Sequence, residues 1–138
     1  MRMMYLAAAA ALMVCAGSAY AQGGAIEVNL TGAAESPKGD PAGSGKATFR
    51  IDAAKGQVCY KLTVAGIGDP TAAHIHKGAA GAAGGPVVPL KAPKGGMVED
   101  CATVAPDVAA DMLKNPAGYY VNVHTAAFPG GAIRAQLG

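Results

Sequence analysis

Short segments in which apolar and polar residues alternate make up much of this chain. In the clearest of them every second residue is apolar, and these positions are Ile26, Val28 and Leu30; Ala47, Phe49 and Ile51; Val58, Tyr60, Leu62 and Val64; and Tyr119, Val121 and Val123. A period of two places the apolar set on one face of a β-strand. Further strands are expected over 71–76, 86–90, 97–104 and 132–137. Because turn residues separate these short segments, the pattern predicts an antiparallel β-sandwich or barrel.

One short helix is expected among the strands, in the segment "PDVAADMLKNP" (106–116). Pro106 stands near its start, Asp107 lies in its first turn and Pro116 ends it. Its apolar stripe consists of Ala109, Met112 and Leu113. We expect this helix to cover one end of the β-structure or to cross between strands. The glycine-rich segments 31–46 and 77–86 are expected to be loops.

The first residues have the pattern of an export signal. The second residue is basic, an apolar run covers 6–14, and Ala19-Tyr20-Ala21 matches a signal-peptidase site. The apolar run is shorter than the ~20 residues of a spanning helix, so no membrane span is expected in the mature protein. We therefore predict a signal peptide over 1–21, cleavage before Gln22, and one domain over 22–138. The mature protein would then be periplasmic or secreted.

The predicted cleavage changes the cysteine count. Of the three cysteines, Cys15 is lost with the signal, and Cys59 and Cys101 remain as an even pair. Paired cysteines in an oxidising compartment favour a disulfide, which we predict between Cys59 and Cys101. The alternative is two buried free thiols.

Charge and reactive residues exclude several classes of function. Eleven Lys and Arg less Arg2 leave ten basic residues against nine acidic ones. No cluster of Lys and Arg or ladder of aromatic residues accompanies them, so no nucleic-acid partner is expected. The few serines stand in no nucleophile-elbow pattern, and the carboxylates are scattered. We therefore expect no catalytic residues.

The three histidines are the candidate chemistry. In "AHIHKG" (73–78), His74 and His76 are two residues apart and share one face of a strand, roughly 7 Å apart at the backbone. His124 alternates with the apolar residues of "YYVNVHT" (119–125) and so also lies outside the core. If the two strands are neighbours, three imidazoles converge on one ion, and their ring nitrogens should lie within about 5 Å of one another.

Imidazole ligands without a carboxylate or thiolate suit copper or zinc better than magnesium or calcium. The alternative remains that the three rings only hydrogen-bond the loops that cover them, or do not meet at all.

Two segments resemble the chordin-type (CHRD) domain. They are "AHIHKGAAGAAGGPVVPL" (73–90) and "NPAGYYVNVHTAAFPGGAIRAQL" (115–137), and the resemblance extends over about 26–137. The second segment is the more specific, through Tyr120, Asn122, His124, Thr125, Pro129, Gly130, Ile133 and Arg134. The chain departs from the family pattern at Ala132, where an acidic residue is common, and at Ala135, where glycine is common.

The resemblance implies an all-β fold, an antiparallel immunoglobulin-like Greek-key β-sandwich with one short helix, related to the Cu/Zn superoxide dismutases. Those enzymes carry copper on a His-x-His strand pair, to which "HIH" is similar, with His124 as a third ligand. They also use a fourth copper histidine, which this chain lacks. Dismutase activity is therefore the function we expect least.

Our leading hypothesis is an exported, non-enzymatic β-sandwich that binds copper, or zinc, through His74, His76 and His124. Asn122 and Thr125 would orient the imidazoles. The competing hypothesis is a metal-free extracytoplasmic module that presents loops, such as 78–85, to a protein or carbohydrate partner.

Overall fold

The computed structural model describes residues 23–138, so the predicted signal peptide lies outside the described residues. Within them the chain forms eight strands, one α-helix and two 3₁₀ turns. In chain order these are β1 (Gly23–Thr31), β2 (Ser44–Asp52), β3 (Gln57–Ala65), β4 (Pro70–Lys77), β5 (Pro86–Leu90), η1 (Lys94–Gly96), β6 (Met97–Thr103), α1 (Pro106–Lys114), η2 (Pro116–Gly118), β7 (Tyr119–Thr125) and β8 (Ile133–Gln136).

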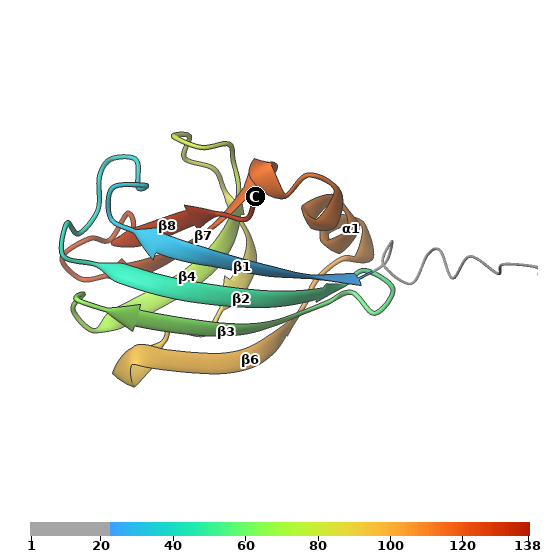
Figure 1. The fold of residues 1–138 in the computed structure, drawn as a ribbon, viewed down its shortest axis with the longest axis horizontal. Helices are drawn as coiled ribbons and strands as arrows, with labels where there is room; N and C mark the ends of the chain where they lie inside the picture. The colour runs from blue at the N-terminus through green and yellow to red at the C-terminus, as the bar shows by residue number, and fades with distance from the viewer. Residues whose placement is uncertain (1–22) are drawn as a thin grey trace, which may run out of the picture.

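All eight strands belong to one antiparallel sheet with the order β5-β4-β7-β8-β1-β2-β3-β6. The sheet curls, so that β1, β2, β3 and β6 face β4, β5, β7 and β8 as the two layers of a sandwich do (Figure 1). Its edges come together where Tyr60 Oη accepts the Lys91 amide at 2.9 Å and Lys91 pairs with Asp100 at 3.0 Å. The predicted all-β fold with one short helix is confirmed, in the form of a single sheet that nearly closes into a barrel.

The core lies between the two halves of this sheet and consists of the residues that the alternation places inside. The fully buried members include Leu30, Phe49, Ile51, Val58, Leu62, Ile75, Val88, Val121, Val123 and Ile133. Helix α1 covers one end of the core, as expected (Figure 1). It buries Ala109 and Met112, while Leu113 packs close to the backbone of Gly24.

A disulfide joins Cys59 and Cys101, which are directly opposite each other on β3 and β6. Both side chains lie on the outer face of the sheet, because their neighbours Val58 and Tyr60 face the core. The predicted pairing is therefore present in the structure. Within residues 23–138 no helix is both long enough and apolar enough to span a membrane.

The outer face of β4, β7 and β8 is covered by two loops. Residues 32–43 connect β1 to β2, and the Asp40 amide of this loop donates to the carbonyl of Ala132, directly before β8, at 2.8 Å. Residues 78–85 connect β4 to β5 and are held by Gln136, which donates to the Gly78 carbonyl at 3.0 Å. The outer face between these loops is therefore a buried polar layer, although alternation alone would leave it exposed to water.

Candidate metal centre

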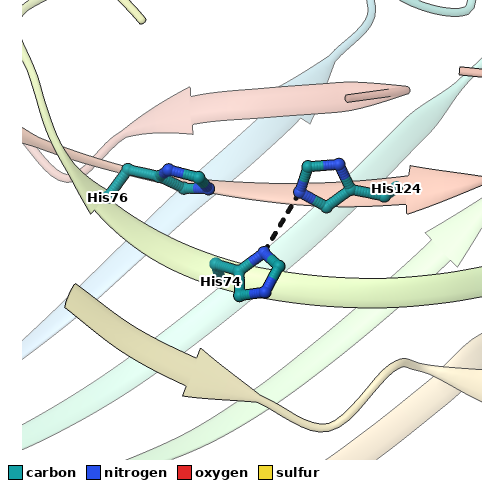
Figure 2. Close-up of side chains that lie close together, drawn as sticks. All are labelled: His74, His76 and His124. Carbon is teal, nitrogen blue, oxygen red and sulfur yellow. Dashed lines mark hydrogen bonds between the residues drawn. The ribbon is translucent and has the colours of Figure 1, made fainter. Parts of the chain in front are cut away.

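The three histidines come from neighbouring strands on this covered face. His74 and His76 lie on β4 and His124 lies on β7, which pairs with β4. Figure 2 shows the three rings grouped around a common space. His74 Nδ1 lies 3.1 Å from His124 Nε2, and one ring nitrogen from each histidine lies within 4.8 Å of the others. The expected separation of about 5 Å or less is confirmed.

This spacing fits one copper or zinc ion after a small movement. Two nitrogens bound to one ion at ~2.0–2.1 Å with a tetrahedral angle lie about 3.3 Å apart. The pair of His74 and His124 already has this separation, at 3.1 Å. The third ring, that of His76, needs to approach by up to about 1.5 Å, which side-chain rotation supplies. Among the described residues, the group contains histidines alone.

In His76 and His124, a backbone carbonyl determines which ring nitrogen can bind a metal. His124 Nδ1 lies 2.9 Å from the Pro129 carbonyl oxygen, and His76 Nδ1 lies 2.9 Å from the Gly84 carbonyl oxygen. A carbonyl only accepts, so in the neutral form of each ring Nδ1 carries the proton and Nε2 has the lone pair. Second partners of this kind orient metal-binding histidines in general. His74 Nδ1 then donates to His124 Nε2 in the metal-free protein.

The surroundings of His74 favour the neutral form of its ring. Burial lowers the pKa of His74 below its ordinary value of 6.5, and the nearby His124 and His76 lower it further when they are charged. The neutral imidazole is the form that binds a metal. The pocket therefore favours the ligand form of His74 at neutral pH.

The two residues predicted to orient the imidazoles differ in position. Asn122 is only 2% exposed, and its Oδ1 lies 2.8 Å from His76 Nε2, inside the cluster. Thr125 instead uses its hydroxyl to accept the Phe128 amide at 3.2 Å. Its effect on the histidines is thus indirect, through the turn that carries the Pro129 carbonyl.

Sequence reasoning assigned no role to Tyr120 or Arg134, which form a stack beside His76. The rings of His76 and Tyr120 are parallel within 2°, with centroids 4.7 Å apart. The Arg134 guanidinium carbon lies 3.4 Å from the Tyr120 centroid. Arg134 also donates to the carbonyls of Ala82 at 2.7 Å and Ala79 at 2.9 Å, so it holds the loop 78–85 against the sheet. The only sequence signal for this pair was their place in the second family-like segment.

Glu35 was also missed. It lies in the loop 32–43 but is only 6% exposed, and its Oε1 has no hydrogen-bond partner among the described residues. Burial raises the pKa of Glu35 to about 7, while the positive charge of Arg134 and a hydrogen bond from Asn122 act in the opposite direction. No pattern could have marked this residue, because an isolated carboxylate in a loop usually faces water.

Comparison with known proteins gives one match. No curated protein and no solved structure matches the chain. The CHRD domain family matches residues 26–137, which include β2 to β8, most of β1 and all three histidines. The chain therefore belongs to the CHRD domain family.

Proposed function

We propose that this CHRD domain protein binds one copper ion, or alternatively zinc, through His74, His76 and His124. The observation that supports this most strongly is the grouping of three ring nitrogens within 4.8 Å, on two paired strands. Backbone carbonyls hold the protons of His76 and His124 on Nδ1, so that a lone pair of each ring is available.

Copper and zinc are the metals that this donor set favours. Three imidazoles without a carboxylate or thiolate suit these ions, and copper lies above zinc in the general order of affinity. The Cys59–Cys101 disulfide is compatible with an oxidising compartment outside the cytoplasm. We propose that the protein acts there, after export, by holding the metal.

We propose that the protein holds the metal and does not catalyse a reaction with it, because the chain has only three histidines. The dismutase copper site that "HIH" resembles uses four.

Metal titration of the purified mature protein tests the proposal. We compare wild type with His76→Ala and with Lys77→Ala, which changes the exposed neighbour on the same strand. Wild type and Lys77→Ala should each bind one copper per chain, and His76→Ala should bind at least ten-fold more weakly because one of three ligands is lost. Equal uptake by wild type and His76→Ala would refute the site.

A second candidate function uses the covering loops. Between them lies a hollow of about 490 Å³, lined by residues 33–38, Ala80, Gly81, Arg134 and Gln136. This volume matches the lower range of small-molecule sites. A metal-free module would receive a protein segment or a carbohydrate in this hollow. In the presence of a chelator, the wild type and His76→Ala would then bind that partner equally well.

A further inference from the structure

A chain of polar contacts runs through the ring of His76. The Gly84 carbonyl lies on one side of the ring, 2.9 Å from Nδ1. On the other side Asn122 Oδ1 lies 2.8 Å from Nε2. Asn122 in turn lies near the Glu35 carboxyl group, whose pKa it lowers by hydrogen bonding.

Asn122 lies in the middle of the candidate metal centre. It is the cross-strand partner of His74 on β4. It is also two residues from His124 on β7, so both side chains are on the same face of the sheet. The Asn122 oxygen therefore faces the space around which the three rings are grouped.

When His76 is neutral, the contact between Asn122 Oδ1 and His76 Nε2 brings two lone pairs together. Nδ1 of His76 carries the proton because the Gly84 carbonyl can only accept, so neutral His76 has none on Nε2. An acceptor oxygen 2.8 Å from an unprotonated nitrogen is unfavourable unless a second ring proton or a metal cation lies between them. Two ligand atoms at ~2.0 Å from one ion are about 2.8 Å apart when the angle between the bonds is near 90°.

Glu35 explains why the amide is oriented in this way. In its ionised form the Glu35 carboxylate only accepts, so it selects the NH₂ end of the Asn122 side chain and leaves Oδ1 facing His76. Glu35 itself is in an unfavourable position, because it is buried and its Oε1 has no partner among the described residues. A buried unsatisfied group of this kind calls for an explanation. The charge of a bound cation would offset its cost.

We infer that Asn122 Oδ1 is a fourth ligand of the metal and that Glu35 holds the amide in the orientation that this requires. The inference rests on the proposed histidine site and extends it. A side-chain amide oxygen is a known ligand of copper in protein sites. Glu35 is then a positioning residue that acts through Asn122.

Gly131 provides the space for Glu35. A methyl group at Gly131 would overlap the Glu35 carboxyl oxygens. The backbone of Gly131 has φ 133°, a conformation that residues with a side chain rarely adopt. The carboxyl group therefore packs against a position that only glycine accommodates.

The test measures the dissociation constant for Cu²⁺ and the electron paramagnetic resonance spectrum of the copper-loaded protein. Asn122→Ala and Glu35→Ala should each weaken binding roughly ten-fold or more. Asn122→Ala should also shift the copper spectrum, because an oxygen ligand is replaced by water. Glu35→Gln should bind more tightly than Glu35→Ala, because the glutamine oxygen accepts the same hydrogen bond from Asn122, and more weakly than wild type, because the negative charge is lost. Lys38→Ala, an exposed change in the same loop, is the matched control.

A double substitution separates this role from a general effect on folding. In Glu35→Gln with Asn122→Asp, the donor and acceptor are exchanged, so the amide of residue 35 donates and a carboxylate oxygen faces the metal. This variant should bind copper at least as tightly as wild type, and far more tightly than Asn122→Ala.

If Asn122→Ala keeps the wild-type affinity and spectrum, or if the double variant binds no better than Asn122→Ala, the inference is refuted. In either case the proposed function still stands if His76→Ala loses the metal. A wild-type protein that binds no copper would instead refute the proposed function.

Discussion

Replacing Arg134 with lysine keeps the positive charge but removes the planar group that holds the loop 78–85 against the sheet. Arg134 is only 2% exposed. Its Nη1 donates to the Ala82 carbonyl at 2.7 Å and its Nη2 to the Ala79 carbonyl at 2.9 Å. The single ammonium of lysine can satisfy one of these carbonyls and cannot stack over Tyr120 in the same way.

The size of the effect follows from the contacts that are lost. One hydrogen bond from a charged donor contributes about 1.5–3 kcal/mol. The guanidinium over the Tyr120 ring contributes about 1 kcal/mol more. We expect Arg134→Lys to lower the free energy of unfolding by about 3 kcal/mol. A typical domain has ~5–15 kcal/mol, so the variant should remain folded and measurable.

Urea unfolding followed by circular dichroism measures this loss. Amide hydrogen exchange reports on the loop itself, because the Ala82 amide donates to Ala79 and the Gly84 amide to the Tyr120 hydroxyl. Both amides should exchange faster in Arg134→Lys. The control is Arg50→Lys, on the exposed face of β2, where we expect a change within ~0.5 kcal/mol. If the two variants are equally stable, with unchanged exchange at Ala82 and Gly84, the assignment of Arg134 as the loop anchor is wrong.

Three further predictions concern stability. Changing Cys59 and Cys101 together to serine should lower the free energy of unfolding by about 4 kcal/mol, because the cross-link closes a loop of 42 residues. Urea titrations measure this loss, and a value below ~1 kcal/mol would contradict the prediction. Tyr60→Phe removes the acceptor of the Lys91 amide where the sheet edges meet. It should lower the free energy of unfolding by about 1 kcal/mol and speed hydrogen exchange of the Lys91 amide. Unchanged exchange would show that this contact does not hold the edges together. Glu35 has a folded pKa of about 7, above its ordinary 4.5, so its contribution to stability is complete below 4.5 and is lost as the pH rises through 7. Between pH 4.5 and just above pH 7, with a chelator present, the free energy of unfolding of the wild type should fall by roughly 1–2 kcal/mol relative to that of Glu35→Gln, after allowance for partial solvent access. Parallel pH profiles of the two proteins would contradict this.

The strands and the helix could be predicted from the sequence because their signals are local. Alternation placed Leu62 and Val121 in the core and His124 outside it, and all three positions agree with the structure. The pair "HIH" needed only the period of two to share a face. The neighbouring position of β4 and β7 was inferred from the family resemblance, since no local signal specifies which strands pair.

Two features depended on interactions between distant segments and could not be predicted. The eight strands form one curled sheet, with β7 between β4 and β8, because pairing depends on contacts between segments far apart in the chain. The outer face is buried because the loops 32–43 and 78–85 fold over it. Such loops have no periodic pattern, so neither the burial of Arg134 nor the position of Glu35 beside Asn122 could be derived.

The most direct test of the histidine site is nuclear magnetic resonance of the mature protein labelled with ¹⁵N in its histidine rings, titrated with Zn²⁺ and with Cu⁺. Three ligands of one ion must respond together. We predict that the ring nitrogen signals of His74, His76 and His124 all shift and that the shifts are complete at one metal ion per chain. Shifts confined to one ring, or signals that still change well beyond one equivalent, would contradict a shared site.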